Sequence, residues 1–262
     1  MTSRYMDKVV VVTGGTRGIG LGCVRAFVGA GSRVVFCSND PAGGTELAAE
    51  LTATGSGQAM FLACDVARTD DVEAFIDRTV ETHGGIDCLV NNAGWHPPHK
   101  PIDAFSYQEF RDLFELNVMG MFAACKRALP HLRRTRGCIV NVASLVATMG
   151  QLEATTYVAT KGAVAAFTKA LAIDEAAHGV RVNSISPGNI FTPLWQQAID
   201  GAPDPARCRA DGEAAQLMGR MGTIEEAGRL CLFLAADATF TTGVDHILSS
   251  GAELGYGRKT RV

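Results

Sequence analysis

The feature that most constrains the fold of this 262-residue chain is a β-branched run that passes through a glycine-rich turn into a helical pattern. The run Lys8–Val12 ends in Thr13–Gly20 (TGGTRGIG), and an apolar helical pattern continues to Ala30. Glycine adopts positive φ and lets the backbone approach a phosphate, while a helix start offers free N–H groups. This order predicts a dinucleotide site, and the alternative is a turn that only redirects the chain. The expected cofactor contacts here are Gly14, Thr16, Arg17, Gly18, Ile19 and Gly20.

Short β-branched runs alternate with longer helical patterns along the rest of the chain. Such alternation predicts βαβ units, and right-handed crossovers favour a doubly wound sheet. Runs such as Val9–Val12 are apolar on both faces, as expected where helices cover both sides. The sequence therefore predicts an α/β fold, a Rossmann-like doubly wound parallel sheet in three α/β/α layers. The expected strands are 8–12, 33–37, 58–63, 86–90, 138–142, 180–185 and 245–248, and the expected helices are 18–30, 45–54, 70–82, 105–132, 157–177 and 224–235.

The chain shows no linker-like segment and no repeat, so we expect residues 1–262 to form a single dinucleotide-binding and catalytic domain. One stretch, Gly201–Arg209 (GAPDPARCR), interrupts the alternation and offers few apolar side chains for burial. Segments of this kind are often loops or lids over a site. We therefore expect a mobile substrate loop near residues 190–220.

Composition and charge argue against several other classes of protein. A formal net charge of -3 gives no electrostatic reason to expect a nucleic-acid partner. The eight cysteines are scattered without a C-x-x-C pair, so we expect no metal site and a reducing compartment. No apolar run reaches about 18 residues, and the N-terminal stretch lacks the apolar region of a signal peptide. We expect no membrane partner and a cytosolic location.

The end of the second expected strand bears on the choice of cofactor. A Rossmann site often has an acid there, which binds the ribose 2′-hydroxyl of NAD. Here the strand ends in CSND (residues 37–40), so Ser38 occupies the informative position and Asp40 follows two residues later. Arg17 is either a partner for the 2′-phosphate of NADP or a solvent-facing arginine. We expect NAD, with NADP as the alternative, and contacts from Ser38 and Asn39.

Two further strand ends carry polar or small residues that we expect to contact the cofactor. Asp65 and Val66 follow the third strand, where the Asp65 carboxylate either accepts from an adenine amino group or makes a turn. Asn92, Ala93 and Gly94 follow the fourth strand. Small residues there let the backbone pass close to a ligand, and the asparagine side chain can also tie the loop together.

Tyr157 and Lys161 are four residues apart, so a helix places them on one face. A nearby ammonium favours tyrosinate and lowers a tyrosine pKa from about 10, which suits a general base in oxidation. Ser144 lies just beyond strand 138–142, where it can hold a substrate oxygen or simply make a turn. Asn117 sits inside a helical pattern that asparagine disfavours, so we expect a kink or a held water there.

Together these motifs resemble the classical short-chain dehydrogenase/reductase family. The resemblance spans most of the chain, in the family's order, and covers 13–20, 91–94, Asn117, Ser144, Tyr157, Lys161 and 187–188. It implies that Tyr157 is the acid–base group and that Lys161 binds the nicotinamide ribose and lowers the Tyr157 pKa. It implies that Ser144 orients the substrate and that Asn117 completes a proton relay through water. It also implies a homotetramer, and contacts to the nicotinamide end from Pro187, Gly188, Ile190 and Thr192.

A narrower resemblance is to the 17-beta-hydroxysteroid dehydrogenase type 14 subgroup. It is carried by residues 92–98 (NAGWHPP), 157–164, 186–195 and 251–257 (GAELGYG). This resemblance implies NAD-dependent oxidation of a 17-beta-hydroxysteroid or of a sugar such as L-fucose. The chain has Ser38 where the subgroup carries an acid. This departure bears on the preference for NAD and not on the chemistry of oxidation. In the last stretch, only Tyr256 has the apolar area to cap a neighbouring subunit's pocket.

The substrate wall is expected near the ends of the strands and beside the tyrosine motif. A loop histidine is usually structural, a loop glutamate is often exposed, and a tryptophan can cover an apolar ring or pack a lid. Both kinds of role therefore stay open for each candidate. In addition to Ser144 and Tyr157, the candidates are His96, Glu153, Asn189 and Trp195.

Three interpretations of function follow. The first is an alcohol dehydrogenase that oxidises a secondary alcohol with NAD and uses no metal, because Tyr157 and Lys161 handle the proton. The second is a dinucleotide-binding sensor without turnover, since a Rossmann fold alone does not prove catalysis. The third is an NADP-dependent carbonyl reductase, for which Ser38 and Arg17 argue. In each case the partner is a small alcohol or ketone, or the dinucleotide alone.

Overall fold

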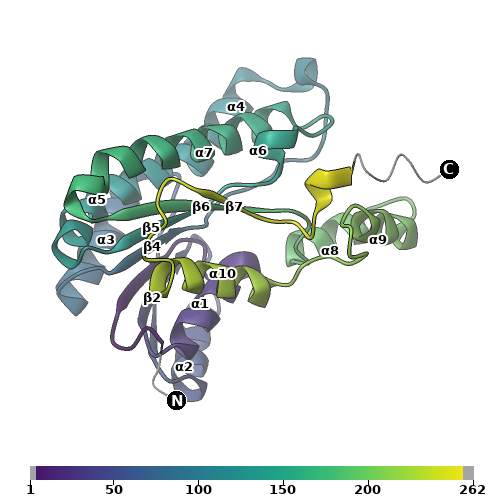
Figure 1. The fold of residues 1–262 in the computed structure, drawn as a ribbon. Coiled ribbons are helices and arrows are strands. Elements are labelled where there is room, and N and C mark those ends of the chain that lie inside the picture. Colours follow the sequence, from purple (N-terminus) through teal and green to yellow (C-terminus); the bar gives the residue numbers. More distant parts are fainter. Residues whose placement is uncertain (1–3, 256–262) are drawn as a thin grey trace.

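The computed structural model describes residues 4–255. Within this part of the chain, seven parallel strands form one sheet in the order β3-β2-β1-β4-β5-β6-β7 (Figure 1). The order places β1 and β4 side by side at the centre, where the direction of winding reverses. The strands are β1 Val9–Val12, β2 Arg33–Ser38, β3 Gln58–Ala63, β4 Cys88–Asn91, β5 Cys138–Val142, β6 Arg181–Pro187 and β7 Asp245–Leu248.

Helices cover both faces of this sheet, which confirms the three-layer α/β/α fold (Figure 1). Helices α1, α2 and α10 pack on one face, and α3, α5 and α7 pack on the other. Among residues 4–255 no helix is both long enough and apolar enough to cross a membrane. The helices are α1 Gly18–Gly29, α2 Gly44–Thr54, α3 Thr69–His83, α4 Tyr107–Phe114, α5 Gly120–Thr135, α6 Val146–Met149, α7 Thr155–Glu175, α8 Pro193–Asp200, α9 Pro205–Ala214 and α10 Ile224–Ala236, with short 3₁₀ turns at Ile102–Ala104 and Ala176–His178.

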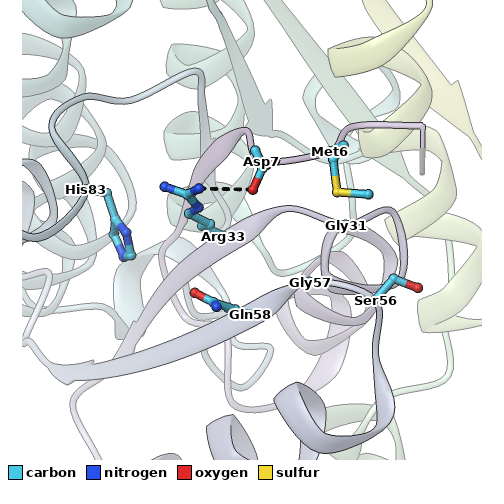
Figure 2. Close-up of a pocket in the computed structure, with 8 residues that line it drawn as sticks. All are labelled: Met6, Asp7, Gly31, Arg33, Ser56, Gly57, Gln58 and His83. Carbon is cyan, nitrogen blue, oxygen red and sulfur yellow. Dashed lines mark hydrogen bonds and ion pairs between the residues drawn. The ribbon is translucent and has the colours of Figure 1, made fainter. Parts of the chain in front are cut away.

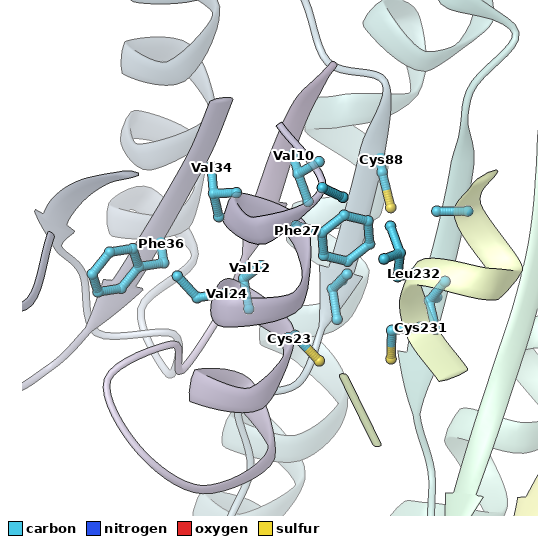
Figure 3. Close-up of a cluster of buried hydrophobic side chains, with 14 of the residues drawn as sticks. Val10, Val12, Cys23, Val24, Phe27, Val34, Phe36, Cys88, Cys231 and Leu232 are labelled. Atoms are coloured by element: carbon cyan, nitrogen blue, oxygen red, sulfur yellow. The ribbon is translucent and has the colours of Figure 1, made fainter. Parts of the chain in front are cut away.

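Three of the four consecutive valines of β1 belong to the two hydrophobic cores. Val10 and Val12 point into the cluster beneath α1 and α10, and Val11 points into the cluster on the opposite face. Figure 3 shows the first cluster, in which Phe27 of α1 and Leu232 of α10 lie over the strands. Successive residues of a strand face opposite sides, so a sheet covered on both faces needs an unbroken apolar run.

The prediction of a single helix over 105–132 is wrong in detail, because the segment forms two α-helices joined by a π-helical turn. Ser106 caps α4 through a capping box with Glu109, so the helix begins at Tyr107. A π-helical turn, Glu115–Met119, then separates α4 from α5, which continues through Pro130 to Thr135. Asn117 lies inside this turn. The irregularity expected from this asparagine is therefore present, as a widened turn.

The expected loop at 201–209 is also partly wrong, because α9 begins at Pro205. The Asp204 carboxylate accepts a hydrogen bond from Arg207 N at 3.0 Å, and Pro205 occupies the first helical position. Thr192 and Pro193 begin α8 in the same way. An aspartate or threonine followed by proline is a helix-start signal, and it outweighs the polar composition of this stretch. The expected role of Tyr256 lies outside the described residues.

Candidate active site

The glycine-rich turn leads from β1 into α1 with the backbone geometry that a phosphate site needs. Gly14 and Gly18 have φ of 66° and 57°, which side chains with a Cβ rarely adopt. Arg17 is the N-cap of α1 but makes no capping hydrogen bond with its side chain, and the first turn contains no acidic residue. The positive end of α1 is therefore left for an anionic group, and the turn fits the pyrophosphate of a dinucleotide.

The segment after β4 joins this turn to the buried lysine of α7. Asn92 Nδ2 donates to the carbonyl oxygens of Thr13 and Gly14, both at 3.0 Å, so its side chain does tie the loop together. Two residues later, a Cβ atom on Gly94 would lie 3.1 Å from Asn117 Oδ1 and 3.5 Å from Lys161 Nζ. Small residues here let the backbone pass between the glycine turn and the lysine.

The ends of β2 and β3 and the exposed Arg17 of the glycine turn carry polar groups of both charges. The Ser38 hydroxyl accepts from Asp40 N at 3.2 Å, and the Asp40 carboxylate accepts from Ala42 N at 2.9 Å, so this acid folds back on its own turn. Arg17 is exposed and makes no ion pair with any residue in 4–255. Asp65 Oδ1 accepts from Ala67 N at 3.1 Å, which is the turn-making role.

Tyr157, Ser144 and Lys161 meet at the carboxyl edge of the sheet. Tyr157 lies in the first turn of α7, and Ser144 lies two residues beyond β5 and hydrogen-bonds to the phenol. Lys161 is buried one turn further along α7, and its Nζ is 5.8 Å from the centroid of the Tyr157 ring. The lysine also donates to the Val142 carbonyl oxygen at 2.8 Å. A phenol, a hydroxyl and an ammonium thus converge on one place.

Burial dominates the protonation of this pair. It raises the pKa of Tyr157 to about 12, against the lowering effect of the hydrogen bond with Ser144. It lowers the pKa of Lys161 to about 8. The expected lowering of the Tyr157 pKa is not found, because burial of the phenol is the largest influence on it and raises it. Any further positive charge near the phenol therefore matters for its use as a base.

Asn117 is buried and binds the loop after β4. Its Oδ1 accepts from Trp95 N at 2.9 Å, and its Nδ2 donates to the Trp95 carbonyl at 3.0 Å and to Thr160 Oγ1 at 3.1 Å. These three bonds join the π-helical turn to the loop and to α7. The asparagine thereby sets the path of the segment that passes Lys161.

Comparison with known proteins bears directly on this site. The family described as Enoyl-(Acyl carrier protein) reductase, a short-chain dehydrogenase group, matches residues 14–253. The chain belongs to the short-chain dehydrogenase/reductase family. It is 52% identical over 259 residues to L-fucose dehydrogenase of Bos taurus, covering 99% of this chain and 94% of that protein. It is 37% identical over 250 residues to cyclopentanol dehydrogenase of Comamonas testosteroni, covering 95% and 98%.

A solved structure is similar to this chain in both fold and sequence. The L-sorbose reductase from Gluconobacter frateurii, complexed with NADPH and L-sorbose, matches with a TM-score of 0.91 and 28% identity, over 96% of this chain and 98% of that one. The short-chain dehydrogenase/reductase family binds nicotinamide dinucleotides. This chain is accordingly an NAD(P)-dependent alcohol dehydrogenase and not a sensor without turnover.

In this dehydrogenase, the substrate-wall candidates separate into two groups. The His96 ring packs on the Tyr157 ring with centroids 4.1 Å apart, and the exposed Glu153 lies in the loop before α7 with φ of 54°. Asn189 instead donates to the Gly212 carbonyl at 2.8 Å, and the Trp195 ring lies 3.0 Å from the position that a Cβ atom on Gly212 would occupy. Asn189 thus ties the segment after β6 to α9, and Trp195 packs α8 against α9.

The residues expected at the nicotinamide end lie at the last residue of β6 and in the segment that follows it. The Pro187 carbonyl accepts from Leu145 N at 3.0 Å, and Gly188 N donates to the Leu248 carbonyl at 2.9 Å. Ile190 is buried, and the Thr192 methyl group lies 3.6 Å from the Cβ position of Gly18. The start of α8 therefore lies across the glycine turn.

Sequence reasoning missed Gln151 and Trp95. Gln151 contacts His96 across two loops, and nothing in the sequence indicates that pairing. Trp95 is 48% exposed beside the Asn117 amide, and the preceding Asn91–Gly94 motif was the available signal.

A concave surface lies at the opposite, amino-terminal edge of the sheet (Figure 2). An ion pair between Asp7 and Arg33 at 3.0 Å spans it, and His83 faces the arginine from α3. The hollow contains no tyrosine, serine and lysine grouping of the kind found at the carboxyl edge. Its lining residues are Met6, Asp7, Gly31, Arg33, Ser56, Gly57, Gln58 and His83.

Proposed function

We propose that this enzyme oxidises a secondary hydroxyl of a sugar such as L-fucose, with NAD as the hydride acceptor and Tyr157 as the base. The observation that carries the proposal is the meeting of Tyr157, Ser144 and Lys161 at the sheet edge that also holds the glycine turn. The sugar is supported by the 52% identity to L-fucose dehydrogenases over almost the whole chain. A single dinucleotide-binding and catalytic domain is supported by the one continuous sheet of residues 4–255.

Each polar side chain of the site has a separate task in this proposal. Ser144 holds the substrate oxygen next to the phenol, and Tyr157 takes the hydroxyl proton as the C–H bond gives up its hydride. Lys161 binds the ribose hydroxyls with its ammonium, and Asn117 fixes the loop that lies over that lysine. The bound nicotinamide supplies the hydride chemistry, which no side chain of the protein can provide.

The remaining cofactor contacts are proposed along the same edge. The backbone of the glycine turn would hold the pyrophosphate, and Pro187, Gly188, Ile190 and Thr192 would line the nicotinamide end. NAD is supported by Asp40, whose negative charge two residues beyond Ser38 disfavours a 2′-phosphate. The exposed Arg17 supports the alternative, an NADP-dependent carbonyl reductase.

A 17-beta-hydroxysteroid is the second candidate substrate. The loops beside Tyr157 expose apolar side chains, with Trp95 at 48%, Met149 at 54% and Leu152 at 83%. Exposed apolar groups around a polar catalytic centre suit a rigid apolar substrate with one hydroxyl. The two substrate classes are distinguished by assaying both with the same protein.

The test is Tyr157→Phe, with NADH formation from L-fucose and from a 17-beta-hydroxysteroid as the readout. The variant keeps the ring and loses only the proton acceptor, so turnover should fall by orders of magnitude, roughly 10²–10⁴-fold. Dinucleotide binding should persist, as measured by NADH fluorescence. A variant that turns over at the wild-type rate would rule out Tyr157 as the base.

We also infer a homotetramer in the cytosol with a mobile lid. Helices α4, α5 and α7 expose Phe110, Phe114, Phe122 and Ile173, which suits burial between subunits. All eight cysteines are free thiols, which suits a reducing compartment. The segment near 190–220 exposes Leu194 and Met218 beside the site, which suits a lid that closes over a substrate.

A further inference from the structure

Beside Tyr157, two imidazole rings are bridged by one amide, an arrangement to which the proposed chemistry assigns no task. His96 packs on the Tyr157 ring, and His99 stacks on His96 with centroids 5.0 Å apart. Gln151 connects the two histidines: its Oε1 lies 3.0 Å from His96 Nε2, and its Nε2 lies 3.4 Å from His99 Nε2. We call His96, Gln151 and His99 the imidazole–amide array.

The hydrogen bonds of His96 decide where a proton must be. Its Nδ1 lies 2.6 Å from the Pro97 carbonyl oxygen, and its Nε2 faces the amide oxygen of Gln151. Both oxygens accept hydrogen bonds and cannot donate them. Each contact is therefore satisfied only if the His96 nitrogen carries a proton. An imidazole protonated on both nitrogens is a cation.

Rotation of the Gln151 amide by half a turn exchanges its donor and acceptor ends. Its nitrogen would then donate to His96, which would become neutral, and its oxygen would require a proton on His99 Nε2. The orientation of the amide is therefore coupled to the charge of His96. In the observed orientation His99 accepts, and the pKa of His99 is lowered, first by burial and then by the charge of His96.

We propose that the imidazole–amide array holds a proton against Tyr157, and that the His96 cation stabilises the tyrosinate that acts as the base. The inference rests on the proposed function of Tyr157. A cation in contact with an aromatic ring favours the anionic form of a phenol. The His96 ring centroid is 4.1 Å from that of Tyr157, nearer than Lys161 Nζ at 5.8 Å, so a charge on His96 would act on the phenol at closer range. His96 is a positioning residue, which acts through Tyr157.

The other charged groups around the array do not place a positive charge as close to the Tyr157 ring as His96 does. Lys100, in the same loop, is engaged by Glu109 of α4 at 2.6 Å. Glu153, before α7, acts on His99 and favours a proton there. From α7 itself, Lys161 faces the Tyr157 ring at 5.8 Å.

The kinetic test is His96→Phe, which keeps an aromatic ring on Tyr157 and removes the proton. We expect the acidic limb of the kcat/KM profile for alcohol oxidation to move to higher pH by roughly one unit. Gln151→Leu should move it in the same direction, because the acceptor for the His96 proton is lost. The matched control, His83→Phe in the hollow at the opposite edge, should leave the limb in place. A limb that stays in place in His96→Phe overturns the proposal.

A spectroscopic test is independent of turnover. Long-range ¹H–¹⁵N correlation spectra of the full chain near pH 7 report the protonation of each imidazole nitrogen, and His96→Phe assigns the His96 signals. We expect both His96 nitrogens to be protonated, and a neutral His96 overturns the proposal. Failure of the protein to oxidise any tested alcohol would instead reject the proposed function, while these spectra would still decide the state of the array.

Discussion

Gly22 of α1 and Gly228 of α10 meet where the two helices cross, and neither position has room for a Cβ atom. A Cβ on Gly228 would overlap the carbonyl oxygen of Gly22, and a Cβ on Gly22 would overlap that of Ile224. Helix α1 begins in the glycine turn, so this contact between backbones fixes the helix that we propose binds the pyrophosphate. The crossing therefore links the stability of the core to the position of the cofactor.

Gly228→Ala should lower the free energy of unfolding by about 1–3 kcal/mol, because one of the two helices must shift. Urea unfolding followed by fluorescence measures the change. The control is Gly29→Ala in α1, where nothing lies within 4 Å of the added methyl group and helix propensity favours alanine. Equal losses in the two variants would show that the crossing is not tight.

Gly94→Ala should impair turnover more than folding. The added methyl group would lie 3.1 Å from Asn117 Oδ1, so it would press on that amide, and it would come into van der Waals contact with Lys161 Nζ at 3.5 Å. We expect kcat/KM to fall at least about tenfold, because small displacements of positioned groups are costly. Steady-state rates and thermal melting measure the two effects. A variant with the wild-type rate would show that Asn117 can give way without consequence.

Cofactor preference should depend on Ser38 and Arg17. Ser38→Asp places a carboxylate at the end of β2, so the ratio of the NADPH Kd to the NADH Kd should rise at least about tenfold, or ~1.4 kcal/mol. Arg17→Gln should weaken NADPH binding and leave NADH binding nearly unchanged. Fluorescence titration with both dinucleotides gives the four constants. Parallel changes for both cofactors would mean that neither side chain reaches the 2′ position.

Lys161→Met should abolish turnover and yet stabilise the fold at neutral pH. Burial lowers the pKa of Lys161 from 10.5 to about 8, so the folded state binds this proton less tightly than the unfolded chain does. The buried charge therefore costs stability in full below pH 8, and the cost fades between pH 8 and 10.5. We expect a gain of about 1–2 kcal/mol at pH 7, after allowing for the lost hydrogen bond to Val142. Urea unfolding at pH 7, 9 and 10 tests it, and a gain that does not shrink with pH contradicts this account.

Much of the fold could be predicted because its signals are local. The valine run of β1 and the glycine turn indicate a covered parallel strand and a helix start without reference to the rest of the chain. Helices α8 and α9 also had local signals, in Thr192-Pro193 and Asp204-Pro205, but the polar composition of that stretch concealed them. Asn117 indicated an irregularity in the helix, but the sequence did not indicate that it would be a π-helical turn.

The site was less predictable where side chains meet across loops. The tyrosine and lysine pair needs only the helical repeat, so its placement on one face followed from spacing. Asn189 and Trp195 lie near the right strand ends, yet both turn towards Gly212. The contact of Gln151 with His96 depends on how two loops approach each other, which no residue spacing encodes.

The π-helical turn also sets the rotation of everything that follows it. Gly120 N donates to the Glu115 carbonyl, five residues back, so the turn contains one residue more than an α-helical turn. One residue corresponds to about 100° of rotation about the axis. Deleting a residue from 115–119 would straighten the helix but swing Ala124, Ala128 and Leu132 out of the interior. An insertion or deletion in this turn thus rotates α5 about its axis more than it changes the length of the helix. The fold does not tolerate such a rotation, whereas it would tolerate the same change in a surface loop.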